Sequence, residues 1–270
     1  MTTPGRYLSF DQVAEVYDLT RVIPPAHMEE IVRLLARETN LVSGGLFLDA
    51  GIGTGRFAAP LAKLYPAQVV GVDISTAMMG RIATKTSPST LSLAQADLQR
   101  LPFQNGKLSG VLLVHILHLI ERWPLVLSEV RRVLTPKSGV LFLGVEMGGR
   151  SVLVDFYFER ARVRRVLAPS VGTASLSPAL AYLRRRERDG GAGAQVTLLE
   201  TPHLAWKRTV PTAQTLEALT GRTYSQMWGI SETDHTELLA ETLSYAHQTF
   251  RKTDAAETLP SRFSLYAVRW

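Results

Sequence analysis

Residues 46–55 restrict most strongly what this chain can fold into. An apolar run reaches Asp49 and then breaks into glycines at alternate positions, Gly51, Gly53 and Gly55. An apolar run of this kind predicts a buried parallel strand, and the glycines predict an abrupt turn, because glycine permits positive φ and close approach of a ligand. Apolar residues at helical spacing follow. The stretch therefore predicts a strand, a tight turn and a helix, in that order.

The glycine spacing distinguishes two classes of ligand. The dinucleotide motif G-x-G-x-x-G needs its third glycine one residue later, where this chain has Arg56. A fixed carboxylate at Asp49 would repel a pyrophosphate, whereas it would attract a ligand that carries an ammonium or a sulfonium. A nicotinamide-dependent oxidoreductase is therefore the disfavoured alternative, which calorimetry with NAD would test.

The motif Asp-Ala-Gly-Ile-Gly-Thr-Gly at residues 49–55 resembles the class I S-adenosylmethionine (SAM)-dependent methyltransferases. The resemblance is greatest to the small-molecule branch related to the ubiquinone/menaquinone-biosynthesis methyltransferases. It covers residues 10–147 well and the remainder loosely. It implies a doubly wound α/β fold of the Rossmann-like methyltransferase type: a mostly parallel seven-stranded sheet, an antiparallel last strand and a helical cap insertion. It also implies methyl transfer from SAM to a small-molecule acceptor.

Two further apolar runs also end in acids. Asp73 follows Asp49 by 24 residues, close to the spacing of a ribose-binding acid after a glycine turn. Ser75 predicts the N-cap of the next helix, which would leave Asp73 for the ligand. The run at 91–96 leads to Asp97. Three strands that each end in an acid are far more specific than one, and they predict a binding site at the strand ends.

The resemblance assigns roles to individual positions. Asp73 would bind the ribose hydroxyls, Asp97 the adenine amino group, and the backbone of Leu98 the adenine ring. Tyr17 would flank the methionine part of SAM, and Arg21 would pair with its carboxylate. An ordinary surface helix is the alternative for the last two. The full set of expected cofactor contacts is Tyr17, Arg21, Asp49, Ala50, Gly51, Gly53, Thr54, Gly55, Asp73, Ile74, Met78, Asp97, Leu98 and Val114.

A fourth strand over residues 108–114 leads into His115. Because ligands of open α/β sheets bind outside the carboxyl ends of the strands, Val114 and His115 are expected near the transferred methyl group. His115 is the first candidate for a general base, with Glu146 and His203 as weaker ones, while His118 is expected to be packed. The acids and histidines lack the spacing of metal ligands, so no metal site is predicted.

Composition limits the remaining alternatives. The chain has 270 residues and no cysteine, which excludes disulfides and cysteine nucleophiles. Of the net charge of +6, four charges come from residues 151–190, with eight arginines and four acids. This surplus leaves an RNA methyltransferase open as an alternative, although solvated helix faces explain it more simply. A non-catalytic SAM-binding protein is the third possibility.

The expected organisation is one domain in four segments. Residues 1–40 would form an N-terminal helical lid, 41–147 the SAM-binding core, 148–194 the helical cap and 195–270 the rest of the sheet. Residues 196–210 are expected to form a single strand. Pro60 predicts a distortion or a late start of the first core helix, and Ser231 with Asp234 predicts a capping box that opens a helix. No membrane span or signal-peptide pattern is evident, so a cytoplasmic monomer or homodimer is expected.

Overall fold

The computed structural model describes residues 22–39, 41–66, 68–84, 91–167, 176–185, 194–199, 204–250 and 255–270. Tyr17, Arg21 and His203 lie outside this described part. The chain divides into two compact units. Unit 1 comprises Met1–Glu146, Val171–Leu204 and Phe263–Trp270, and unit 2 comprises Met147–Ser170 and Ala205–Arg262. The four-segment organisation within one domain stays a prediction.

Strands and helices alternate along most of unit 1. Its strands are β1 (Phe47–Ala50), β2 (Val69–Asp73), β3 (Leu91–Gln95), β4 (Gly110–Val114), β5 (Val140–Gly148, whose last two residues belong to unit 2) and β6 (Gln195–Leu199). Its helices are α1 (Pro25–Glu38), α2 (Ala58–Leu64), α3 (Thr76–Gly80), α4 (Trp123–Val133) and α6 (Leu176–Arg185). Unit 2 holds α5 (Val152–Val163), β7 (Ala205–Pro211), α7 (Thr212–Thr220) and α8 (Glu232–Thr249). Strand β8 (Ala256–Arg269) begins in unit 2 and ends in unit 1.

Within the described residues, eight strands form one sheet in the order β3-β2-β1-β4-β5-β8-β6, with β7 also paired to β8. The pairs among β1 to β5 are parallel, and β6 and β7 run antiparallel to β8. The expected α/β sheet with an antiparallel last strand is thus confirmed. It has eight strands because the single strand expected at 196–210 is two strands, which pair with successive parts of β8. The strand order reverses beside β1. In open α/β sheets, ligands bind at such a reversal, so the carboxyl ends of β1 and its neighbours are where a ligand site is expected.

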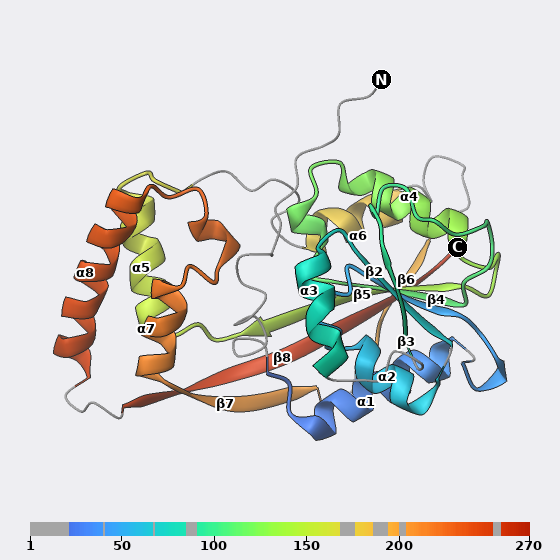
Figure 1. Cartoon of the computed structure of the whole chain (residues 1–270), viewed down its shortest axis with the longest axis horizontal. Coiled ribbons are helices and arrows are strands. Elements are labelled where there is room, and N and C mark those ends of the chain that lie inside the picture. Colours follow the sequence, from blue (N-terminus) through green and yellow to red (C-terminus); the bar gives the residue numbers. More distant parts are fainter. Residues whose placement is uncertain are drawn as a thin grey trace. The chain divides into compact units, whose positions relative to one another are not determined.

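The core of unit 1 lies on both faces of the sheet. All four residues of β1 are buried, as expected for a parallel strand covered on both sides. Leu48 and Ala50 join an apolar cluster with residues of α4 and α6. Because side chains alternate along a strand, Phe47 and Asp49 face the opposite side. Figure 1 shows α4 and α6 above the sheet and α1 and α2 below it. Asp49 is therefore directed toward the layer that contains α2.

Three local predictions about helix starts are confirmed. Helix α2 begins late, at Ala58, so Pro60 falls in its first turn, where a missing N–H costs no hydrogen bond. The Oγ of Ser75 accepts the N–H of Met78 at 3.0 Å and caps α3. The Oγ of Ser231 accepts the N–H of Asp234 at 3.1 Å and caps α8. The serine caps are typical N-cap hydrogen bonds.

Unit 2 has an apolar core built from α5, α7 and α8. Tyr157 is fully buried there, and its hydroxyl lies 2.7 Å from Nδ1 of His235. On the surface, Arg160 of α5 and Arg164, the C-cap of this helix, form ion pairs with Glu241, and Arg164 also pairs with Glu237. None of the helices within the described ranges is long and apolar enough to cross a membrane.

Candidate functional site

The turn after β1 adopts a backbone that only glycine accommodates easily. Gly51, Gly53 and Gly55 have φ values of 80°, 54° and 73°. A Cβ at Gly51 would lie 2.9 Å from Cγ1 of Ile116, and one at Gly55 would lie 3.0 Å from Cγ1 of Ile82. The predicted positive φ angles are therefore confirmed, and side chains are excluded for steric as well as conformational reasons. The turn presents bare main chain at the end of the strand.

Asp73 joins the end of β2 to this turn. Its Oδ2 accepts the N–H of Gly53 at 2.8 Å, and its Oδ1 accepts the N–H of Ser75 at 2.9 Å. The expectation that the Ser75 cap leaves Asp73 to the ligand alone is wrong, because the carboxylate already accepts two backbone amides. A carboxylate oxygen has two lone pairs, so a bond from a backbone amide does not by itself prevent it from accepting a ligand hydroxyl. The two amide bonds fix the direction in which the carboxylate points.

Asp49 is buried beneath the same turn. Its pKa is raised from 3.8 to about 7, mainly by burial and also by the nearby charge of Asp73. The backbone N–H of Ala58, at the start of α2, donates to the carboxylate and lowers the pKa, as does the positive charge of Arg56. Close to neutral pH, Asp49 is thus poised between its two forms, and a cation placed in the turn favours the ionised form.

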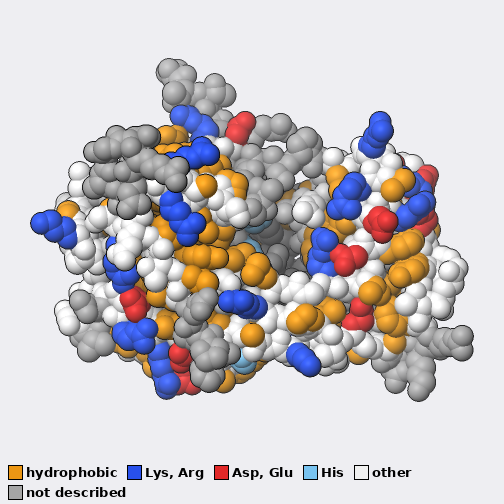
Figure 2. Space-filling view, turned by 180° about the vertical axis from the view of Figure 1, so that it is seen from behind, with side chains coloured by type: hydrophobic (Ala, Val, Ile, Leu, Met, Phe, Trp, Pro, Cys, Tyr) orange, Lys and Arg blue, Asp and Glu red, His pale blue; other side chains and the backbone are white. Residues whose placement is uncertain are grey.

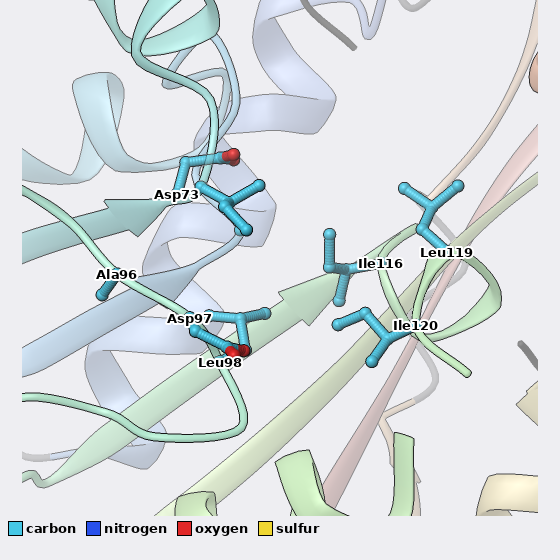
Figure 3. Close-up of a pocket in the computed structure, with 9 residues that line it drawn as sticks. Asp73, Ala96, Asp97, Leu98, Ile116, Leu119 and Ile120 are labelled. Carbon is cyan, nitrogen blue, oxygen red and sulfur yellow. The ribbon is translucent and has the colours of Figure 1, made fainter. Parts of the chain in front are cut away.

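A cavity opens beside these acids at the carboxyl ends of the strands. It holds about 350 Å³ of empty space, part of it open to solvent, and is lined by Gly51, Asp73, Ile74, Ala96, Asp97, Leu98, Ile116, Leu119 and Ile120. Figure 3 shows Asp73, Asp97 and Leu98 on one side of this space and the three side chains of residues 116–120 on the other. One wall is therefore acidic at its rim and the other is apolar. This combination suits a ligand that has a flat ring in one part and hydroxyl groups in another.

Some of the residues predicted from the sequence line this cavity, and others lie outside its lining. Gly51, Asp73, Ile74, Asp97 and Leu98 line it. The other described positions of the predicted set lie outside this lining: Asp49, Ala50, Gly53, Thr54, Gly55, Met78 and Val114. Sequence reasoning missed Ala96 and the apolar wall. The apolar run after His115 could have indicated this wall, because its residues at positions 116, 119 and 120 have the spacing of one helical face.

His115 lies at the end of β4 but outside the lining of the cavity. Its φ of 51° is left-handed, which is uncommon for a residue with a side chain. The backbone N–H of Glu146 donates to its Nε2 at 3.1 Å. Because a ring nitrogen that accepts a hydrogen bond carries no proton, this contact holds the imidazole in its neutral form. His118 lies on the short 3₁₀ helix Leu117–Leu119, which also supplies Leu119 to the cavity wall.

Glu146 also forms an ion pair with Arg56, the residue that follows the glycine turn. Its Oε2 lies 3.0 Å from Nη1 of Arg56, and the two side chains are 9% and 13% exposed. The guanidinium lies over the ring of Phe57, 4.8 Å from its centroid. The pair therefore links the turn after β1 to the end of β5. Among the described residues no group of acids and histidines could hold a metal ion.

The sequence matches a family model described as a methyltransferase domain over residues 48–143. The chain is 32% identical to the ubiquinone/menaquinone biosynthesis C-methyltransferase of Syntrophotalea carbinolica over 178 residues, which are 64% of this chain and 74% of that protein. It is 35% identical to the malonyl-acyl-carrier-protein O-methyltransferase of Legionella pneumophila over 97 residues, 35% of this chain and 34% of that protein.

Solved structures agree on the fold. A protein of Anaeromyxobacter dehalogenans described as a candidate type II methyltransferase aligns with a TM-score of 0.54. The alignment covers 98% of this chain and 97% of that chain at 15% sequence identity. At this identity the likeness concerns the arrangement of strands and helices alone.

Proposed function

Because the chain belongs to the class I SAM-dependent methyltransferases, we propose that it binds SAM across the carboxyl ends of β1 to β4 and methylates a small molecule. One observation carries the proposal of the binding site. The bare glycine turn and the acid at the end of β2 are hydrogen-bonded to each other beside a cavity with an apolar wall. Membership of the family supports the reaction, and the geometry of this strand edge supports our choice of the binding site.

The described residues offer partners for the adenine, the ribose and the sulfonium of the cofactor. The rim of the cavity offers Asp73 for ribose hydroxyls and Asp97 for an amino group, while Ile74 and Leu98 offer apolar surface to a ring. Ile74 is 42% exposed, which is high for an isoleucine and leaves its side chain available for such a contact. Asp49 supplies negative charge beneath the turn. We propose Tyr17 and Arg21 as partners of the methionine part, from the family resemblance.

SAM supplies a methyl group that its sulfonium already activates, so the protein's main task is to hold an acceptor in line and to exclude water. The apolar wall of Ile116, Leu119 and Ile120 serves that exclusion. His115 remains our candidate for a general base, under one condition that the structure sets. Its Nε2 must first release the amide of Glu146 before it can accept a proton.

We propose an apolar or aromatic small molecule as the acceptor. The similar protein of S. carbinolica is named a C-methyltransferase of quinone biosynthesis, and that of L. pneumophila is named an O-methyltransferase. The longer match is the quinone enzyme, so reduced quinone precursors come first in an acceptor panel, followed by carboxylic acids and phenols.

Two measurements test the proposal. Calorimetry with SAM and with NAD on the purified chain should give binding for SAM alone. Transfer of a radioactive methyl group from SAM to the acceptor panel should then identify the acceptor class. Binding of NAD without SAM would overturn the cofactor assignment, and tight SAM binding without transfer to any acceptor would favour the non-catalytic alternative.

An RNA acceptor is disfavoured by the surface of unit 2. Arg160 and Arg164, two of the arginines in the basic segment, are paired with acids of α8. On the face of unit 2 seen in Figure 2, basic and acidic side chains are intermixed, without a continuous basic patch. RNA affinity that collapses with salt would reverse this view. A cytoplasmic location and a monomeric or homodimeric state stay predictions, for cell fractionation and light scattering to test.

A further inference from the structure

Two side chains that follow the ends of β1 and β4, where we propose that the cofactor binds, are capable of carrying positive charge, although neither lines the cavity. Arg56 directly follows the last glycine of the turn, and its charge acts on Asp49 beneath that turn. His115 lies at the end of β4, the strand that pairs with β1. A positive charge on either side chain would oppose the binding of a cationic ligand there, because like charges repel strongly at partly buried sites.

One residue, Glu146, acts on both of these groups by different means. Its carboxylate pairs with Arg56 at 3.0 Å, in a nearly buried ion pair. Its backbone N–H donates to Nε2 of His115 at 3.1 Å, a contact that only the ring form without a proton on Nε2 can accept. Glu146 is 90 residues from Arg56 and 31 from His115 in sequence, so the fold alone brings the three together.

We propose that Glu146 is a positioning residue that keeps the cofactor site free of surplus positive charge. It neutralises Arg56 through its side chain and holds His115 neutral through its main chain, so that Asp49 and Asp73 leave the site favourable to a sulfonium. The inference rests on the proposed function, since it presumes that SAM binds at this edge of the sheet. By this inference, Glu146 in β5 helps the protein to distinguish the positively charged cofactor from its uncharged product.

The test compares two ligands that differ by one methyl group and one charge at sulfur. SAM carries a sulfonium, whereas S-adenosylhomocysteine (SAH) carries a neutral thioether in an otherwise identical molecule. Calorimetry on the full chain gives the ratio of Kd for SAM to Kd for SAH. For Glu146→Gln we expect this ratio to rise about three- to tenfold, because Arg56 loses its compensating negative charge while the side-chain volume is kept.

A second variant gives the opposite sign. Arg56→Met removes the positive charge and keeps an apolar stem beside Phe57, so Glu146 becomes an uncompensated negative charge. The ratio should then fall by a similar factor, and the double variant should return it to within about twofold of wild type. Damage to the fold weakens both ligands together, so it could not produce shifts of the ratio in opposite directions in the two single variants.

Glu29→Gln is the matched control, because Glu29 pairs with Arg33 on the exposed face of α1 with side chains 57% and 66% exposed. It should leave the ratio unchanged. Equal weakening of SAM and SAH in both Glu146→Gln and Arg56→Met would overturn the inference and leave the proposed function intact. Absence of binding of either ligand to the wild-type chain would instead overturn the proposed function, and the inference with it.

Discussion

Asp73 and Gly53 are joined by a hydrogen bond of 2.8 Å from the glycine N–H to the Oδ2 of the carboxylate. The bond connects the end of β2 to the turn after β1, so one acid both shapes the turn and faces the cavity. This double role predicts different results for two substitutions at residue 73. The alanine variant loses the acceptor and the charge, whereas the asparagine variant keeps an acceptor for the glycine amide.

For Asp73→Ala we predict a loss of SAM affinity of about 100-fold, the equivalent of one or two charge-assisted hydrogen bonds. For Asp73→Asn we predict a smaller loss of SAM affinity and a melting temperature between those of Asp73→Ala and wild type, because asparagine can accept only one of the two backbone amides. Calorimetry and thermal unfolding of the two variants measure both quantities. Binding of SAM by Asp73→Ala with the wild-type Kd would remove Asp73 from the site.

Gly53→Val should abolish SAM binding by blocking the turn. The φ of Gly53 is 54°, and even a single Cβ would lie 3.2 Å from Cε of Met78. A β-branched side chain there is both strained and in the path of the ligand, so the melting temperature should also fall. Gly80→Ala is the control, since a Cβ at Gly80 meets no atom within 4 Å and alanine favours its helix. Wild-type affinity in Gly53→Val would show that the ligand lies elsewhere.

The features that could be predicted from the sequence depend on residues that are close together in the chain. The glycine turn, the buried β1, the late start of α2 before Pro60 and the caps at Ser75 and Ser231 each depend on residues within a few positions of one another. Their physical causes, which are permitted φ angles, missing amides and serine side-chain acceptors, are properties of residue type. For that reason they can be read from one sequence.

The features that it missed depend on residues far apart in the chain. The ion pair of Arg56 with Glu146 could not be predicted from the sequence around either residue. An arginine after a turn, or an acid near the end of a strand, has the same local sequence pattern whether or not it forms such a pair. The second role of Asp73 could not be foreseen either, since it requires the register that sets β1 beside β2. The division of the strand expected at 196–210 depends on β8, which is long enough to pair with β7 along its first half and with β6 along its second half.

The raised pKa of Asp49 predicts that the stability of the fold falls as pH rises toward neutrality. Its pKa is raised from 3.8 to about 7 in the folded chain, so between these values the folded state binds more protons than the unfolded state. The stabilising contribution of the protonated form is full below pH 3.8 and is lost as pH rises to about 7. Asp49→Asn should therefore raise the melting temperature by about 5 °C at pH 8 and by clearly less at pH 5, where only part of this contribution has been lost.

The matched control for this comparison is Asp155→Asn, because Asp155 is 53% exposed and pairs with Arg150 on the surface. It should show no such pH dependence. Thermal unfolding at the two pH values gives the comparison directly. A destabilised Asp49→Asn at pH 8 would mean that the ionised carboxylate is favoured in the folded chain.

Tyr157→Phe should destabilise unit 2 by about 1–3 kcal/mol, because it removes the hydroxyl bound to Nδ1 of His235 and leaves that nitrogen buried. Burial, followed by the charge of Arg222, lowers the pKa of His235, so its neutral ring can accept a hydrogen bond from the tyrosine hydroxyl. Tyr245→Phe is the control, since Tyr245 stacks on Phe156 and its hydroxyl is no part of this pair. Denaturant unfolding compares the two variants, and equal free energies of unfolding would contradict the prediction.

His115 offers the sharpest test of catalysis, provided that its backbone is preserved. Its left-handed φ of 51° would strain an alanine, whereas asparagine adopts this conformation readily. His115→Asn should therefore keep the strand end in place while removing the ring. With the acceptor found in the panel, we predict that kcat falls at least about tenfold while Kd for SAM changes less than about twofold. His115→Ala should show the same loss of rate with an added loss of stability. An unchanged kcat in the asparagine variant would limit His115 to packing and leave the reaction to positioning alone.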